Sequence, residues 1–193
     1  MEKDTSFAKL VSLGCHDVRT PLATVHGFAK TLERVTELEP PADRYVEMIG
    51  KASAEMAELL DELSLAARIE QGTYEPALRE ANTFALAEAA RERLGDDRVH
   101  VTGEGAEIST DVQAIGRGVS ALIQAALRHG GLDVVDVVVR GPVIEVTPIT
   151  DAAAPVVLGR ELRDLGAAVA VRVIERLGGA VEVEDGSLEI ALA

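Results

Sequence analysis

The stretch LGCHDVRTPLATVHGF, residues 13–28, lies within a long run of helical apolar spacing and contains Pro21. A proline inside a helix removes one backbone hydrogen bond and crowds the carbonyl four residues earlier, at a cost of about 3 kcal/mol. Apolar residues around it step alternately by four and three positions, as in a coiled-coil seam. They are Val11, Cys15, Val18, Leu22, Val25, Ala29 and Leu32. The stretch therefore predicts a long amphipathic helix that carries an interruption one turn after His16.

A second seam with the same spacing follows a predicted turn at ELEPPAD, residues 37–43. Its members are Tyr45, Ile49, Ala52, Met56, Leu59, Leu63 and Ala66. The two helices are expected to form an antiparallel hairpin whose apolar stripes remain partly in water, where each Leu or Val forgoes about 1.5–3 kcal/mol. We therefore predict a homodimeric four-helix bundle. The alternative is that the hairpin packs against the rest of its own chain.

Composition narrows the class of protein. The chain has 193 residues, 47% of them hydrophobic, which favours a folded protein with one or two domains. Its 19 basic and 33 acidic residues give a net charge of −14 and exclude nucleic acid as a favoured partner. The single cysteine, Cys15, and the lack of a signal-like or membrane-spanning apolar run predict a cytoplasmic protein without a membrane partner.

The register places His16 one position beyond the seam residue Cys15, on the solvent side of the predicted bundle. A neutral imidazole presents a nucleophilic ring nitrogen at cytosolic pH. Arg19 and Thr20 follow at three and four positions and share the same helix face. This spacing fits an anion beside a nucleophile, although it also fits ordinary surface residues.

The string CHDVRTPLATVHGF, residues 15–28, resembles the H-box of sensor histidine kinases. The matching positions are His16, Asp17, Val18, Arg19, Thr20, Pro21 and Leu22. The resemblance implies that His16 accepts a phosphoryl group, that Asp17 accepts a proton and orients the ring, and that Thr20 occupies the position linked to dephosphorylating partners. It further implies that Pro21 bends the helix where the receiver domain of a response regulator docks.

Small residues lie on the helix below this motif. Ala23, Thr24 and Gly27 can admit a partner helix or serve in close packing, and both readings stay open. His26 lies outside the H-box pattern, and we interpret it as a surface residue.

The second half of the chain alternates helical and β-branched segments. Gly72 and Pro76 mark a linker at residues 72–82, which separates a hairpin domain, 1–72, from a second domain, 80–193. We expect helices at 83–94, 111–129 and 160–177, strands at 98–102, 133–139 and 142–147, and a closing hairpin at 179–192. Residues 167–193 resemble the last helix and hairpin of the kinase ATP-binding domain. The predicted class is α+β, a helical hairpin followed by a degenerate histidine-kinase-type ATPase α/β sandwich.

The segments that bind nucleotide in that family are altered here. ALIQAALRHG, residues 121–130, resembles the N-box, but Ala125 stands where an asparagine holds magnesium. In the adenine-binding segment the aspartate's position is held by Pro148 or by Asp151, depending on the alignment, and there is no glycine from Val143 to Leu158. We therefore expect no ATP binding.

Two other glycine-containing segments support the same expectation. In LGRELRDLGAAVA, residues 158–170, the second glycine-rich box is reduced to the isolated Gly159 and Gly166. Gly103 and Gly105 lack a following Lys and are predicted to form a turn rather than a phosphate loop.

An H-box joined to a degenerate ATP domain resembles the dimeric histidine phosphotransferases of bacterial phosphorelays. The resemblance implies transfer between receiver aspartates through His16, with no cofactor of its own and with magnesium supplied by the receivers. Two alternatives remain: a non-catalytic pseudokinase that sequesters a regulator, and an active histidine kinase with an unusual nucleotide site.

Overall fold

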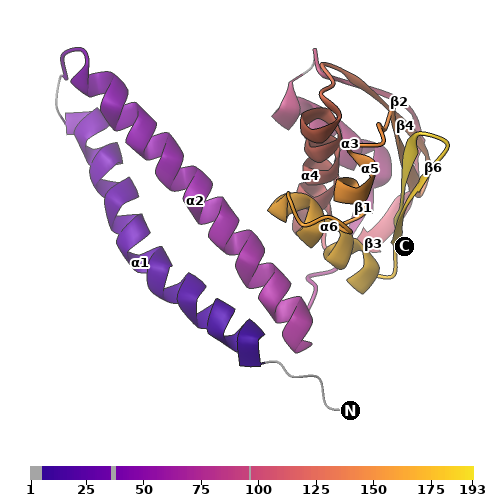
Figure 1. Ribbon diagram of the computed structural model, residues 1–193, viewed down its shortest axis with the longest axis horizontal. Helices are drawn as coiled ribbons and strands as arrows, with labels where there is room; N and C mark the ends of the chain where they lie inside the picture. Colours follow the sequence, from indigo (N-terminus) through magenta and orange to yellow (C-terminus); the bar gives the residue numbers. More distant parts are fainter. Residues whose placement is uncertain (1–5, 36–37, 96) are drawn as a thin grey trace. The chain divides into compact units, whose positions relative to one another are not determined.

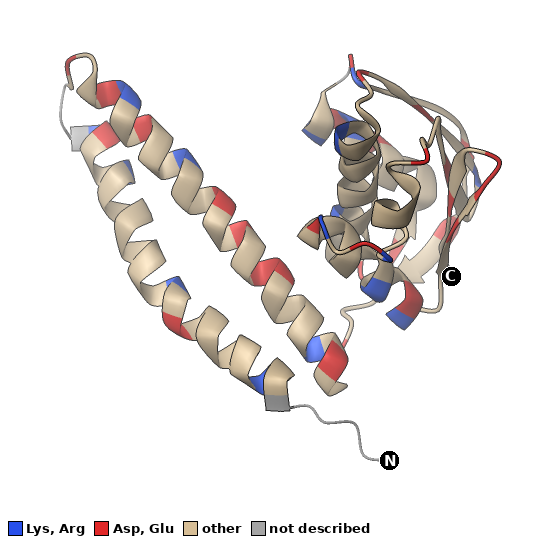
Figure 2. Cartoon of the chain, viewed as in Figure 1, with Lys and Arg blue, Asp and Glu red and all other residues tan. Residues whose placement is uncertain are grey.

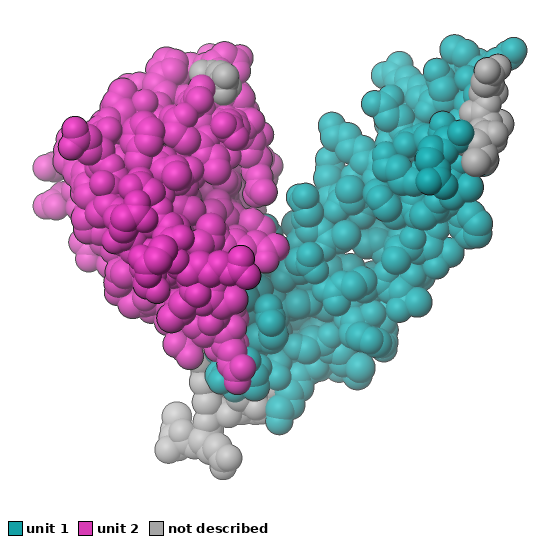
Figure 3. All heavy atoms as spheres, turned by 180° about the vertical axis from the view of Figure 1, so that it is seen from behind, with its two compact units in different colours: residues 1–73 teal, residues 74–193 magenta. Residues whose placement is uncertain are grey.

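The computed structural model describes residues 6–35, 38–95 and 97–193. The chain divides into two compact units, Met1–Thr73 and Tyr74–Ala193 (Figure 3).

The first unit is a hairpin of two helices that contact each other along their lengths, α1 (Ser6–Val35) and α2 (Ala42–Gln71). Helix α1 continues through Pro21, and Figure 1 shows it curved along its length. Helix α2 ends where predicted, because Gly72 adopts the left-handed conformation and its N–H caps the carbonyls of Arg68 and Ile69. The predicted hairpin is confirmed.

The hairpin buries part of the first predicted seam and no residue of the second, because the buried residues of α2 are Val46, Gly50, Ser53, Leu65 and Ala67. Cys15, Leu22 and Ala29 are buried, whereas Val18, Val25 and Leu32, which alternate with them, are 43–51% exposed. The second helix leaves a similar set in solvent: Tyr45, Ile49, Met56 and Leu59. The hairpin alone therefore leaves a stripe of apolar residues exposed along both helices.

The second unit is a two-layer α/β sandwich (Figure 1). Its mixed sheet has the order β2-β4-β5-β7-β6. The strands are β2 (Val99–Gly105), β4 (Val135–Gly141), β5 (Val143–Thr147), β6 (Ala180–Glu184) and β7 (Ser187–Ala191). Strands β2 and β4 are parallel, and the other neighbours are antiparallel.

Three helices cover one face of this sheet: α3 (Thr83–Leu94), α4 (Val112–Gly130) and α6 (Leu165–Arg176). The core lies between the two layers, where alternating strand residues meet the apolar faces of the helices. Its largest fully buried side chains include Ile115, Leu122, Ile123, Ile144, Ile174, Leu188 and Ile190. The predicted order, a hairpin followed by an α/β sandwich, is confirmed.

A short second sheet differs from the sequence expectation. Strand β1 (Arg79–Asn82) lies within the predicted linker and pairs with β3 (Glu107–Thr110). Gly103 and Gly105 belong to strand β2 rather than to a turn, so that prediction was wrong. The reason is close packing, because a Cβ at Gly103 would collide with the Val139 carbonyl of the neighbouring strand.

The helix predicted at residues 160–177 is shorter than expected. It begins at Leu165 because Asp164 caps it, its side chain accepting the Ala167 N–H at 3.1 Å. A separate short helix, α5 (Ala154–Val157), precedes it and contacts both α4 and α6. Within the segment between β5 and α6, α5 is thus packed against the helical layer, while residues 160–163 are exposed.

Candidate functional site

His16 projects from α1 into solvent, with 77% of its side chain exposed, as the register predicted. Its Nδ1 lies 3.1 Å from Oδ1 of Asp17. An ionised carboxylate only accepts hydrogen bonds, so this contact assigns the ring proton to Nδ1. The Nε2 atom of His16 then carries the free lone pair and is the nucleophilic position.

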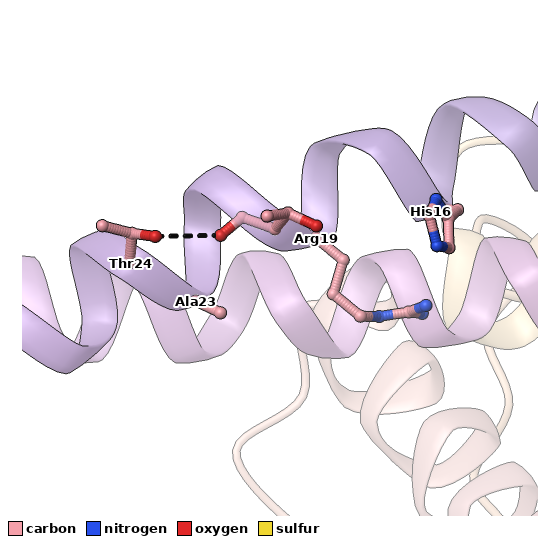
Figure 4. A pocket seen from close by; sticks show the side chains of 5 residues that line it. His16, Arg19, Ala23 and Thr24 are labelled. Carbon is pink, nitrogen blue, oxygen red and sulfur yellow. Dashed lines mark hydrogen bonds between the residues drawn. The ribbon is translucent and has the colours of Figure 1, made fainter.

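A surface pocket of about 500 Å³ lies beside this ring. It is lined by His16, Arg19, Thr20, Ala23 and Thr24, which occupy successive turns of α1 (Figure 4). The Thr24 hydroxyl donates to the Thr20 carbonyl at 3.2 Å, which keeps that side chain against its own helix. The pocket is therefore open to solvent and lined partly by the small side chains of Thr20, Ala23 and Thr24, and Arg19 is the arginine in its lining.

The other predicted site residues lie outside the pocket lining. Asp17 contacts His16 from the adjacent position, while Pro21 and Gly27 are exposed on α1. A Cβ built at Gly27 would meet open space, so steric crowding within the hairpin does not explain this glycine.

Two residues of α2 that sequence analysis missed complete the surroundings of Arg19. Its Nη2 donates to Oδ1 of Asp61 at 2.9 Å and lies 3.4 Å from the Ser64 hydroxyl. Asp61 and Ser64 are three residues apart on α2, and therefore on one helix face. An antiparallel alignment of the two helices would have placed Asp61 and Ser64 opposite Arg19. The residue spacing within one helix does not contain this information.

The interpretation of His26 as a surface residue was wrong. Its side chain is half-buried, and Nδ1 lies 2.9 Å from the hydroxyl of Ser53, which is 1% exposed. The Ser53 hydroxyl donates its own hydrogen to the Gly50 carbonyl at 2.8 Å, so it accepts from His26. His26 therefore joins α1 to α2 through a buried polar contact.

In the second unit, the position that resembles the magnesium-binding asparagine is apolar and enclosed. Ala125 has no exposed surface, and α5 contributes Val156 and Val157, which are buried against the helical layer. A methyl group offers no lone pair to a metal ion.

Asp164 gathers the polar groups at the start of α6. Its Oδ2 lies 3.1 Å from Nε2 of His129 and 3.4 Å from Nη1 of Arg128, while its Oδ1 accepts the Ala167 N–H. The side chains of His129 and Asp164 are only 17% and 10% exposed. A helix N-terminus with neighbouring cations is a favourable place for an anion, and here the anion is the protein's own carboxylate.

Asp111 caps α4 in a similar way with neutral donors. Burial raises the pKa of this carboxyl, but hydrogen bonds from the Ala114 N–H, the Tyr74 hydroxyl and the Ala77 N–H lower it, and the net pKa lies below its usual 3.8. Asp111 therefore ties the first residues of the second unit to α4.

Comparison with known proteins identifies the first unit. Residues 9–72 match the family model of the His Kinase A (phospho-acceptor) domain. The hairpin is therefore similar to the phospho-acceptor domain of histidine kinases. The match covers the hairpin that carries His16 and stops before the α/β sandwich.

Solved structures share the fold of both units. Full-length ShkA in complex with AMPPNP is similar with a TM-score of 0.67 and 19% identity, over 96% of this chain and 46% of that one. The chain thus spans less than half the length of ShkA. The Acinetobacter baumannii histidine kinase AdeS is similar with a TM-score of 0.56 and 17% identity, over 92% and 98% of the two chains. A search of curated proteins finds no match.

The described residues contain neither a metal-binding cluster nor a helix suited to a bilayer. Within residues 6–35, 38–95 and 97–193, no group of three or more His, Cys, Asp or Glu side chains is placed to hold a metal ion. In the same residues, no helix combines the length and apolar character needed to cross a bilayer.

Proposed function

We propose that this protein is a histidine phosphotransferase that relays a phosphoryl group between receiver aspartates through Nε2 of His16, without using ATP. The observation that carries the proposal is the exposed His16 ring, oriented by Asp17 and bordered by the Arg19 pocket. The match of residues 9–72 to a phospho-acceptor domain supports the same role for His16.

The proposed step is a transfer between a receiver aspartyl phosphate and the histidine ring. Nε2 attacks phosphorus, the N–P bond forms, and the P–O bond to the receiver aspartate breaks, so that its carboxylate leaves with the electron pair. The Nδ1 proton remains on the ring, hydrogen-bonded to Asp17, which stabilises the positive charge that the imidazole gains. The reverse step delivers the group to a second receiver, and the receivers supply magnesium.

The second unit supports a relay that does not depend on ATP. Ala125 offers no metal ligand, and Asp164 places a negative charge at the N-terminus of α6, where a nucleotide phosphate would otherwise be favoured. A phosphate brought there would meet like charge from Asp164 and would have to displace it from Arg128 and His129. We infer that the sandwich serves as a scaffold for partner binding.

Two partners follow from the hairpin surface. A second copy of the chain is proposed to cover the exposed apolar stripe that includes Val18, Val25, Ile49 and Met56, which would form a four-helix bundle. A receiver domain is proposed to dock over the small-walled face formed by Pro21, Ala23, Thr24 and Gly27, next to the pocket.

One labelling experiment separates this proposal from a kinase and from a pseudokinase. The purified chain is incubated with γ-labelled ATP and magnesium, and separately with a panel of labelled phospho-receiver domains. We expect label only from a receiver, and none in His16→Ala. The matched control is His100→Ala, which removes another exposed histidine and should keep the label.

The other outcomes identify the alternatives. Label from ATP would establish a kinase despite Ala125. A receiver that binds without transferring label would establish a sequestering module and reject the phosphotransferase.

A further inference from the structure

Arg19 is fixed across the hairpin before any anion binds. Its Nη2 is held by Asp61 at 2.9 Å, with the Ser64 hydroxyl at 3.4 Å. A guanidinium has five N–H donors in a rigid plane. Among the described residues, Nη1 and Nε of Arg19 make no hydrogen bond, so one edge of the plane is anchored on α2 and the other remains available.

The anchored guanidinium belongs to the same pocket as the nucleophile. His16 and Arg19 both line it, and Figure 4 shows the Arg19 side chain running toward the His16 end. The pocket is open to solvent and contains one cation, so an incoming phosphoryl group has Arg19 as its source of positive charge there. The orientation of this side chain therefore matters for transfer.

The ion pair itself adds little to folding stability. The Arg19 and Asp61 side chains are 44% and 53% exposed, and exposed ion pairs are strongly screened. Figure 2 shows several other acidic residues along α2, so negative charge on this helix is not special to position 61. What distinguishes Asp61 is its contact with a residue of the pocket.

We propose that Asp61 is a positioning residue, which holds the Arg19 guanidinium so that its free edge meets the phosphoryl oxygens as Nε2 of His16 attacks. The proposal rests on the phosphoryl-acceptor role of His16 proposed above. A long arginine side chain that is already ordered loses less conformational entropy when it binds the transition state. Asp61 thus acts through Arg19 and does not touch the reacting atoms.

Two phosphoryl donors test this role. One is a labelled phospho-receiver domain, and the other is potassium phosphoramidate, from which Nε2 takes the phosphoryl group while the P–N bond breaks and ammonia leaves. The variants are Asp61→Asn, which removes the charge, Asp61→Glu, which restores it, and the control Glu55→Gln, on an exposed acid of the same helix. Initial rates are measured over a range of donor concentrations, with thermal unfolding by circular dichroism as the check on folding.

The expected pattern separates positioning from binding and from stability. Asp61→Asn should lower the maximal rate with both donors by about threefold to tenfold, with an unchanged half-saturating receiver concentration and an unchanged melting curve. Asp61→Glu should recover at least half of the loss, and Glu55→Gln should match the wild type. An unchanged maximal rate in Asp61→Asn, or a change only in half-saturation, would overturn the proposal.

The two donors also distinguish this inference from the proposed function. If phosphoramidate labels His16 and Asp61→Asn slows that reaction, while no phospho-receiver transfers label, the relay is wrong and the positioning role stands. If both donors label the wild type and Asp61→Asn at equal rates, the relay stands and the positioning role is wrong. If neither donor labels the wild type, both are wrong.

Discussion

The two units each contain a histidine ring nitrogen and an aspartate oxygen that lie 3.1 Å apart, but the surroundings of the two pairs differ. In the first unit, the side chains of His16 and Asp17 are 77% and 67% exposed, and Asp17 contacts Nδ1 of the His16 ring. In the second unit, the side chains of His129 and Asp164 are 17% and 10% exposed. Asp164 contacts Nε2 of the His129 ring and also caps α6. The first pair leaves a ring nitrogen of His16 exposed to solvent. In the second pair, both carboxylate oxygens of Asp164 already contact other groups.

The difference teaches that contact distance alone does not distinguish a solvent-accessible histidine ring from one held in a structural contact. Within the described part of the chain, Asp17 contacts the His16 ring alone and leaves Nε2 accessible, whereas Asp164 contacts a helix N-terminus, His129 and Arg128 together. Exposure and the number of groups that share a carboxylate separate the two roles. Mutations in the first pair should therefore change rates, and mutations in the second should change stability.

The largest expected effect is kinetic and lies at Asp17. Asp17→Ala removes the group that fixes the Nδ1–H form of His16 and stabilises the charged ring. We expect phosphoryl acceptance from a phospho-receiver to slow by about 100-fold, with the melting temperature unchanged because both side chains are exposed. Initial rates of phosphohistidine formation provide the measurement.

The matched control for this rate is Asp164→Ala. It removes the carboxylate of the other pair and should leave the rate per folded molecule within about twofold, since it belongs to the other unit. Equal rates in wild type and Asp17→Ala would show that the neighbouring carboxylate does not orient the acceptor.

The second effect is thermodynamic and lies at Asp164. Asp164→Ala removes the N-cap of α6 and leaves the half-buried His129 without its acceptor, which should lower the free energy of unfolding by about 2 kcal/mol. Urea unfolding followed by circular dichroism gives the total, and hydrogen exchange of the α6 amides assigns the loss to the second unit.

A third histidine–aspartate pair serves as the control for stability. His100 and Asp136 are 58% and 65% exposed, with Nδ1 and Oδ1 3.3 Å apart across β2 and β4. Asp136→Ala should lower the free energy of unfolding by less than about 0.5 kcal/mol. If Asp136→Ala lowers the free energy of unfolding as much as Asp164→Ala does, burial does not explain the different stability contributions of the two pairs.

Much of the first unit could be predicted from the sequence. The hairpin follows from apolar spacing within each helix, the end of α2 from Gly72, and the exposure of His16 from its place beside Cys15. These are local properties, because each depends on residues within a few turns. The Asp17 contact is local in the same sense.

Contacts between distant segments could not be predicted in this way. Arg19 meets Asp61 after 42 residues, and His129 meets Asp164 after 35. His26 was misread for the same reason, since its partner Ser53 lies on the other helix. Such pairs depend on how two elements are placed in register, which periodicity within one element does not contain.

A smaller effect is expected at Asp111, which caps a helix with neutral donors only. Asp111→Ala should lower the free energy of unfolding of the second unit by about 1 kcal/mol. Because the pKa of this carboxyl is lower in the folded protein than its usual 3.8, its stabilisation is complete above that value and is lost as the pH falls through the folded pKa. Urea unfolding at several pH values should show a constant difference near neutrality that closes below about pH 4.

The loss of this stability difference at low pH distinguishes an effect of the ionised Asp111 carboxylate from an effect of side-chain packing. A difference between wild type and Asp111→Ala that stays constant as the pH is lowered stepwise below 3.8 would show that the carboxylate charge is not the source of the stabilisation. Asp133→Ala, at an exposed acid in the same unit, provides the matched control and should show almost no difference at any pH.

The smallest expected effect is at His100, which tests whether an exposed histidine–aspartate pair is sufficient for phosphoryl acceptance. His100 resembles His16 in exposure and in its carboxylate neighbour, but it lies on a sheet, and the pocket that holds Arg19 is on α1. His100→Gln should therefore leave labelling from a phospho-receiver within about twofold of wild type, and stability within about 0.5 kcal/mol. Mass spectrometry of the labelled wild type should find the phosphoryl group on His16 alone. Label on His100 at a comparable rate would mean that exposure and a nearby carboxylate suffice, and that the arginine-lined pocket adds nothing.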